Sequence, residues 1–288
     1  MGDFAILFLT EIFMTTLSTQ TYAEQLFTSY ESYRVDSFRQ VIDDSAKTSS
    51  GLLSSRKAGD SFEGRPIRLI SAGTGQIVVL LWSQMHGDEP TATMAIADML
   101  QYLMKAKNDT ATQLILSSLS FNFLPLLNPD GAARFQRRTA QGIDMNRDAL
   151  ALCTPEARIL KQLQHELNPH FGFNLHDQEL STVGTSNKLT AIALLAPAFD
   201  HEKSDNDVRT RAKQVAATFA SIMNLRAANN IARYDDSFEP RAFGDNMQKW
   251  GTSTVLVESG HALNDPEKKI YPQTELYRFA CLSLCNCH

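Results

Sequence analysis

The sequence has few cysteines, no long apolar run and no excess of cationic residues, and each shortage excludes a class of protein. Four cysteines among 288 residues, three of them within the last eight positions, do not form the framework of a disulfide-rich secreted domain. The apolar stretch near the N-terminus lies between Asp3 and Glu11 and contains no lysine or arginine. It therefore fits neither a secretory signal nor a membrane span of about 20 residues.

The charge balance excludes a second group of functions. The formal net charge is -5, from 27 Lys and Arg against 32 Asp and Glu. Non-specific binding to nucleic acid or to an anionic membrane needs clustered cations, so we expect neither partner. In the absence of a signal or a span, the sequence favours a cytoplasmic protein. The hydrophobic content of 43% is sufficient for a sizeable core.

The chain divides at about residue 60. Residues 1–60 are expected to form an N-terminal extension that is helical at 22–44 and a loop rich in Ser and Gly at 47–59. Residues 61–288 are expected to form one catalytic domain. The cysteines and the histidine of the last eight residues do not look like a natural finish for a last helix, and a frayed terminus is a poor frame for a metal cluster. We therefore interpret this end as disordered or truncated.

Strands and helices alternate through the predicted domain. Expected strands occupy residues 66–71, 76–82, 119–127, 171–175, 189–195 and 252–257, and expected helices occupy 90–105, 155–167, 205–223 and 265–284. Alternation with fully apolar strands predicts an α/β fold, in which one mixed, largely parallel sheet has helices on both faces. Sites in such sheets form at the carboxyl ends of strands. His86, Asn128, His176 and Glu258 all fall just past expected strand ends.

Three of these positions carry the chemistry of a hydrolytic zinc site. His86 and Glu89 are three residues apart, directly after an apolar run, and alone they could be the polar cap of a strand-to-helix loop. His176 adds a third ligand of a type that zinc prefers, and a His₂Glu set leaves a fourth position open for water. Glu258 adds a carboxylate at the mouth of the sheet, where a general base belongs.

Two arginine-containing pairs follow the Asn128 turn. Arg137 and Arg138 are adjacent, and Asn146 and Arg147 come shortly after them. The planar fork of arginine binds two carboxylate oxygens at once, so these residues suit a substrate with a free carboxylate. One member of the Arg137–Arg138 pair is expected to be only a solvated charge.

In this order the motifs resemble the zinc metallocarboxypeptidases of the carboxypeptidase A type, in a compact, bacterial-like branch. The resemblance runs from about residue 61 to about residue 280. Each motif alone is weak, but six in order are specific. They are His86-x-x-Glu89, Asn128-Pro129-Asp130-Gly131, Arg137-Arg138-Thr139, Asp144-Met145-Asn146-Arg147, Asn174-Leu175-His176 and Glu258-Ser259-Gly260.

The resemblance implies a metal centre with defined roles. One zinc ion per chain would be bound by His86, Glu89 and His176. Glu258 would act as base on the zinc water and then protonate the leaving amine. Asp144 matches the carboxylate that orients the first histidine ligand, a partner that metal-bound imidazoles usually have.

The resemblance also implies how a substrate is held. Arg137 would polarise the scissile carbonyl and hold the oxyanion, with Arg138 as the alternate register. Asn146 and Arg147 would grip the terminal carboxylate of the substrate. Tyr234 is the candidate for the tyrosine that caps the substrate in this family.

The register of that tyrosine and the substrate preference stay open. Phe238 or Phe243 could fill the place expected for Tyr234. Acidic residues at 235 and 236 could select basic substrates, whereas Arg241 could select acidic ones or lie on a helix face. The sequence does not decide between these possibilities.

The favoured function is a carboxypeptidase that acts on peptides or peptide-like amides. The alternatives are an N-acyl amino acid deacylase, like the aspartoacylase and succinylglutamate desuccinylase relatives, and an amidase of cell-wall peptides. A catalytically dead binding module would have lost a ligand or the base, and all are present. The expected partner is therefore a peptide or acylated amino acid with a free carboxylate, and the oligomeric state is undetermined.

Overall fold

The computed structural model describes residues 44, 46–47, 49–224 and 227–263. Apart from residue 44, the helix expected at 22–44 lies outside this part of the chain. The helix expected at 265–284 and the cysteine-containing end also lie outside it. No helix among the described residues is long and apolar enough to cross a membrane.

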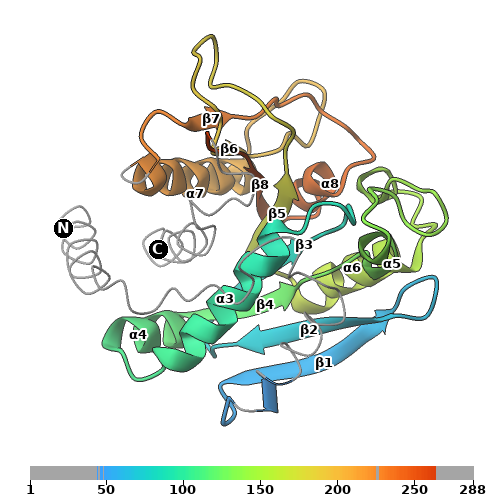
Figure 1. Ribbon diagram of the computed structural model, residues 1–288, viewed down its shortest axis with the longest axis vertical. Helices are drawn as coiled ribbons and strands as arrows, with labels where there is room; N and C mark the ends of the chain where they lie inside the picture. The colour runs from blue at the N-terminus through green and yellow to red at the C-terminus, as the bar shows by residue number, and fades with distance from the viewer. Residues whose placement is uncertain (1–43, 45, 48, 225–226, 264–288) are drawn as a thin grey trace.

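The described residues form one eight-stranded sheet with the order β1-β2-β4-β3-β5-β8-β6-β7 (Figure 1). The four central strands β4, β3, β5 and β8 are parallel to one another. Strand β2 is antiparallel to both β1 and β4, and β6 is antiparallel to β8 but parallel to β7. This is the mixed, largely parallel sheet that the sequence predicts. The strands are β1 (Leu53–Asp60), β2 (Pro66–Ala72), β3 (Ile77–Ser83), β4 (Leu119–Leu124), β5 (Phe171–Asp177), β6 (Ile192–Leu195), β7 (Ile231–Arg233) and β8 (Ser253–Ser259).

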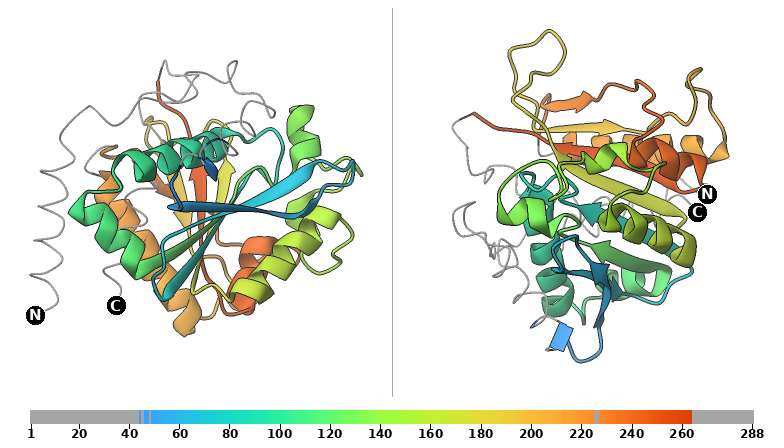
Figure 2. Two further views of the ribbon diagram at one scale, coloured as in Figure 1. Left: turned by 90° about the horizontal axis from the view of Figure 1, so that it is seen from below. Right: turned by 90° about the vertical axis from the view of Figure 1, so that its right-hand side faces the viewer.

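Helices cover both faces of the sheet (Figure 2). The helices are α3 (Thr91–Lys105), α4 (Thr110–Ser118), α5 (Pro129–Ala133), α6 (Pro155–Leu167), α7 (Asp207–Asn224), α8 (Phe243–Lys249) and the 3₁₀ turn η1 (Met145–Arg147). Helices α3, α4 and α7 pack on one face, and α6 and α8 pack on the other. Each face of the sheet has its own hydrophobic core. Strand β3 contributes Val79 and Leu81 to the core under α3, α4 and α7, and Leu80 and Trp82 to the core under α6 and α8. Burial on both faces explains why this strand is apolar without alternation.

The prediction of a loop at 47–59 is wrong from Leu53 onward. Strand β1 pairs along its length with β2, from Leu53 opposite Ala72 to Asp60 opposite Pro66. Most of its side chains are exposed or half-buried, so it lacks the apolar alternation by which a strand is recognised. An edge strand of this kind is held by main-chain pairing to its neighbour. The sheet therefore begins before residue 61.

Helix α6 begins at the predicted residue and offers a test of local stability. The Thr154 hydroxyl accepts a hydrogen bond from the Ala157 N–H (3.1 Å) and donates one to Asp148 (2.9 Å). Thr154 is fully buried. We expect Thr154→Ala to lower the free energy of unfolding by about 1 to 2 kcal/mol, because it removes the N-cap and leaves the buried Ala157 N–H without its acceptor. Urea denaturation measures the change.

The matched control is Asp109→Ala. Asp109 is the N-cap residue of α4, but its side chain makes no capping hydrogen bond. Its replacement should therefore change the free energy of unfolding by much less. Equal losses in the two variants would contradict the capping argument.

Candidate metal centre and active site

Three potential ligands converge at the carboxyl ends of the central strands. His86 and Glu89 lie in the segment between β3 and α3, and His176 lies on β5. Nδ1 of His86 is 2.7 Å from Oε1 of Glu89, and Nδ1 of His176 is 2.7 Å from Oε2. All three side chains are buried, and their ligand atoms lie within 4.8 Å of one another. The sequence-predicted ligand set is therefore assembled in space.

The donor set fits a zinc ion. Both imidazole rings direct Nδ1 to the same carboxylate, so two nitrogens and a carboxylate oxygen lie within 4.8 Å of one another. Zinc is bound by this combination in catalytic sites that keep one position for water. Burial raises the pKa of Glu89, but the charges and hydrogen bonds of His176 and His86 outweigh it and hold the pKa well below its usual value. Glu89 is thus ionised, as a metal ligand must be.

Gly87 allows the ligand-bearing segment to lie against the Asn128 turn. A Cβ atom at Gly87 would be 2.1 Å from the carbonyl carbon of Gly131, which is far below any allowed contact. The Asn128 side chain joins the two segments, because it donates to the Met85 carbonyl (3.2 Å) and accepts from the Gly131 N–H (2.9 Å). Where the sequence predicts a turn, the structure begins the short helix α5 with Asn128 as its N-cap, and this junction lies against the ligand-bearing segment.

Asp144 connects the metal centre to the neighbouring arginine. Its Oδ1 is 3.2 Å from Nε2 of His86 and accepts from the Asn146 N–H (2.9 Å), and its Oδ2 accepts from Nε of Arg137 (3.2 Å). One carboxylate therefore orients a ligand, an arginine and the start of η1 together. The structure places Asp144 where the sequence comparison expected an orienting carboxylate.

The two adjacent arginines point in different directions. Nη1 of Arg137 is 3.0 Å from Nδ1 of His86 and 3.2 Å from Oε1 of Glu89, so its guanidinium lies at the ligand set. Arg138 instead donates to the carbonyl of Gly142 (3.1 Å). Of the two arginines that the sequence offers for the oxyanion, Arg137 is the one whose guanidinium lies at the ligand set.

Glu258 lies beside the third ligand. It is on β8, directly opposite His176 in the register of the parallel pair β5–β8, and it is only 7% exposed. Burial raises the pKa of the Glu258 carboxyl to about 7, and the nearby Glu89 carboxylate adds to this effect. A buried carboxyl group with a pKa near neutrality is suited to accepting and returning a proton.

Asn146 and Arg147 lie in η1, next to the loop that follows β7. The Asn146 side-chain oxygen accepts from the Phe243 N–H (3.0 Å). Nε of Arg147 is 3.3 Å from Oε2 of Glu239, and its Nη1 donates to the Asn146 carbonyl (2.7 Å). Glu239 was missed by the sequence analysis, because no motif includes it and 92 residues separate it from Arg147.

Tyr234 follows the edge strand β7 on the side of the active site. Its N–H donates to the Leu194 carbonyl (3.0 Å), which extends the pairing of β6 and β7 by one residue. Burial raises the pKa of the Tyr234 hydroxyl, and the carboxylates of Glu258 and Glu89 raise it further.

The two phenylalanines considered in place of Tyr234 lie elsewhere. Phe243 is fully buried in the core beneath α8. The Phe238 ring packs edge-on against His201, with 4.9 Å between the ring centroids. Neither contacts the ligand set in these positions.

Of the three charges considered for substrate selection, Asp236 and Arg241 are paired with opposite charges, whereas Asp235 accepts hydrogen bonds from the uncharged Ser237. Asp236 accepts hydrogen bonds from Lys203 (2.9 Å) and Arg233 (2.7 Å). Arg241 donates from Nε and Nη2 to the two carboxylate oxygens of Glu239, at 2.9 Å each. Asp236 and Arg241 are therefore already engaged by opposite charges of the protein.

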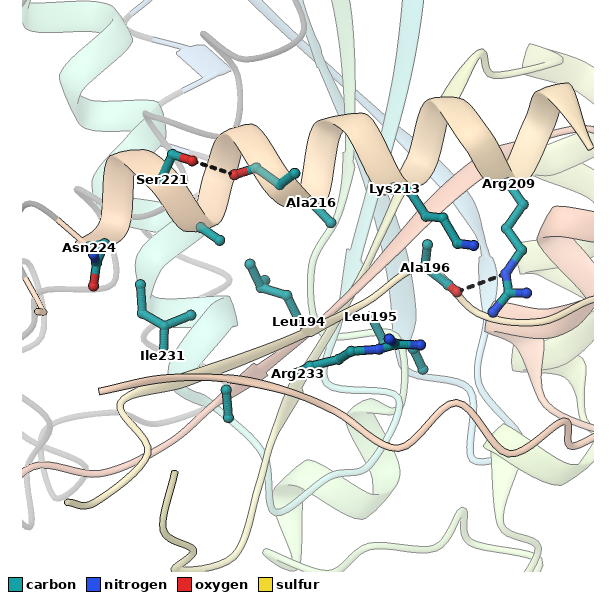
Figure 3. A pocket seen from close by; sticks show the side chains of 13 residues that line it. Leu194, Leu195, Ala196, Arg209, Lys213, Ala216, Ser221, Asn224, Ile231 and Arg233 are labelled. Atoms are coloured by element: carbon teal, nitrogen blue, oxygen red, sulfur yellow. Dashed lines mark hydrogen bonds between the residues drawn. The ribbon is translucent and has the colours of Figure 1, made fainter. Parts of the chain in front are cut away.

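Two cavities differ in their relation to the metal centre. One of about 460 Å³ is lined by Glu89, Arg137 and His261 among others, so it opens beside the ligands. Another of about 670 Å³ lies between α7 and strands β6 and β7 (Figure 3). Arg209, at one end of it, donates to the Ala196 carbonyl (3.3 Å). None of the metal-ligand candidates lines this second cavity, so we place the reaction at the first.

Comparison with known sequences identifies related proteins over part of the chain. The family model for zinc carboxypeptidases matches residues 38–189. Carboxypeptidase 2 of Trichophyton rubrum is 30% identical over 142 residues, which cover 46% of this chain and 26% of that protein. Carboxypeptidase SOL1 of Arabidopsis thaliana is 28% identical over 120 residues, which cover 39% of this chain and 24% of that protein. The chain thus spans about a quarter of the length of these curated relatives.

Solved structures show the same fold. A metallo-carboxypeptidase from Pseudomonas aeruginosa, in complex with (2-guanidinoethylmercapto)succinic acid, has a TM-score of 0.69 at 15% identity, with 89% of this chain and 70% of that chain covered. Carboxypeptidase A from Helicoverpa armigera has a TM-score of 0.66 at 16% identity, with 98% and 80% covered.

Proposed function

The chain belongs to the zinc carboxypeptidase family, and we propose that it is a zinc-dependent metallocarboxypeptidase that hydrolyses a C-terminal peptide or peptide-like amide bond. The observation that carries this proposal is the convergence of the three ligand candidates with Glu258 and Arg137 at one edge of the sheet. A ligand set alone would suit many metal enzymes. A ligand set with a buried base and an adjacent arginine suits acyl transfer from an amide to water.

The bound zinc ion would supply a Lewis acid and lower the pKa of a water molecule in its open position. His86, Glu89 and His176 would hold this ion. Glu258 would take up the proton of the attacking water and deliver it to the leaving amine, for which its raised pKa is suited. Glu258 would therefore act first as the general base and then as the general acid.

Four side chains at the candidate active site would bind the substrate. Arg137 would stabilise the negative charge that develops on the carbonyl oxygen, because its guanidinium lies at the ligand set. Arg147, supported by Asn146, would bind the terminal carboxylate. Tyr234 would cover the substrate from the β7 side, which agrees with its exposed side chain and with the effect of the Glu258 charge on the pKa of its hydroxyl.

The role of Arg137 can be separated from that of its neighbour. We expect Arg137→Ala to lower kcat about 10²–10³-fold, because one preorganised donor for the oxyanion is lost. Arg138→Ala is the matched control and should keep kcat within about twofold, because its guanidinium donates to the Gly142 carbonyl and not to the ligand set. Steady-state kinetics on one peptide measures both. A larger loss in the Arg138 variant would reverse the assignment.

The reaction itself is tested with a mixture of peptides and N-acyl amino acids, incubated with the zinc-loaded protein and followed by mass spectrometry. We expect loss of single C-terminal residues, abolished by a chelator and restored by zinc. Loss of acyl groups with the peptides untouched would make the protein a deacylase instead. Cleavage confined to cell-wall peptides would make it an amidase of that class.

A further inference from the structure

The loop that follows β7 carries a carboxylate bound by two arginines. Nε and Nη2 of Arg241 each donate to one oxygen of Glu239, at 2.9 Å. Nε of Arg147 lies on the other side, 3.3 Å from Oε2 of the same carboxylate. Two cations therefore share one anion, and the group of three keeps one net positive charge for a ligand.

The main chain holds Glu239 in this place. The Glu239 N–H donates to Oδ1 of Asp245 in the first turn of α8 (3.1 Å). The Phe243 N–H donates to Oδ1 of Asn146, which ties the end of the loop to η1 (3.0 Å). The main chain of the loop is thus joined to α8 at Glu239 and to the segment that carries Arg147 at Phe243.

Arg147 is held at two of its nitrogen atoms. Nε faces Glu239, and Nη1 donates to the carbonyl of Asn146 (2.7 Å). Among the described residues, Nη2 has no assigned acceptor, so this end of the guanidinium is left to meet a ligand. A long side chain held at two points loses less conformational freedom when a ligand binds.

Arg241 prevents the Glu239 carboxylate from repelling an anionic substrate. Its side-chain hydrogen bonds are the main reason why the pKa of Glu239 falls to about 2, so Glu239 stays ionised at every relevant pH. The same bidentate contact compensates its charge. Without Arg241, Glu239 would instead neutralise Arg147.

We propose that Glu239 is a positioning residue, neutralised by Arg241, which holds the Arg147 guanidinium toward the terminal carboxylate of the substrate. The proposal rests on the proposed carboxypeptidase function, because it assumes that Arg147 binds a carboxylate. A purely structural ion pair is the competing interpretation. Exposed ion pairs add little to stability, so the two interpretations differ mainly in substrate binding.

The test compares Glu239→Gln with Glu166→Gln. Glu166 is a matched control, because it pairs with Arg56 on the surface between α6 and β1 and its side chain is 45% exposed. For one peptide with a free C-terminus, we expect Glu239→Gln to raise KM about tenfold and to keep kcat within about twofold, the pattern seen when binding of the ground state and of the transition state is weakened equally. Glu166→Gln should leave both constants unchanged.

A binding measurement gives a second readout that does not depend on turnover. Calorimetry with the N-acetylated form of the released amino acid should show about tenfold weaker binding to Glu239→Gln than to the wild type. The primary amide of the same compound should bind both proteins equally, because it presents no carboxylate. The melting temperature of Glu239→Gln should stay close to that of the wild type.

Each outcome decides the proposal. An unchanged KM with unchanged binding of the acid would overturn it, and so would a loss confined to kcat. Equal weakening of the acid and the amide would also overturn it, because the effect would then not pass through the carboxylate. If no peptide is cleaved but the acid binds in a Glu239-dependent way, the positioning role stands and the carboxypeptidase function fails.

Discussion

Glu258→Gln is expected to lower kcat by about 10²–10⁴-fold and to leave zinc binding intact. Glutamine keeps the size of the side chain and its place opposite His176 on β5 and β8. Glutamine cannot take up a proton, so it can neither accept one from the attacking water nor donate one to the leaving amine. Steady-state kinetics with saturating peptide, together with the zinc content by elemental analysis, measures the effect.

A second buried glutamate provides the control for this variant. Glu156 is fully buried on α6, and burial raises the pKa of its carboxyl group as it does for Glu258. It lies outside the metal centre, so Glu156→Gln should keep kcat within about twofold in the folded protein. If Glu258→Gln kept more than a tenth of the wild-type kcat, another group would have to be the base.

His176→Ala is expected to weaken zinc binding at least about 100-fold and to abolish activity with it. The three candidate ligands are the only protein groups that a tetrahedral site with one open position requires, so loss of one leaves an incomplete set. It also removes a partner of the Glu89 carboxylate, which His176 contacts at 2.7 Å. Competition with a zinc-chelating dye measures the affinity.

His165→Ala is the matched control, because His165 lies exposed in the last turn of α6. Its replacement should leave zinc affinity unchanged. Zinc affinity that survives in His176→Ala, but is lost in a variant of another histidine, would move the metal centre away from β5.

The central elements of the fold could be predicted because local and tertiary requirements agree in them. The apolar run of β3 is buried on both faces, and α6 has a threonine N-cap followed by proline. The edge strands β1 and β7 could not be predicted in the same way. They are short or polar and gain their structure from pairing with a neighbour, which leaves no periodic pattern in the sequence.

Much of the candidate site could be predicted for a related reason. Each ligand candidate and Glu258 lies at or just past the end of an apolar run, and parallel strands bring such ends to one edge. The choice between Arg137 and Arg138 could not be predicted. It depends on the direction in which each side chain points from the main chain. Arg137 is directed by its hydrogen bond to Asp144, and Arg138 by its hydrogen bond to the Gly142 carbonyl.

The sequence by itself determined the family, the α/β alternation and the identity of the ligand candidates, because these follow from residue type, spacing and order. The tertiary structure alone decided which arginine meets the metal centre, which aromatic residue lies near Glu258, and that Glu239 shares Arg147 with Arg241. The physical reason is that these relations join segments far apart in the chain. The direction of a side chain at such a junction depends on its neighbours in space, which no local pattern records.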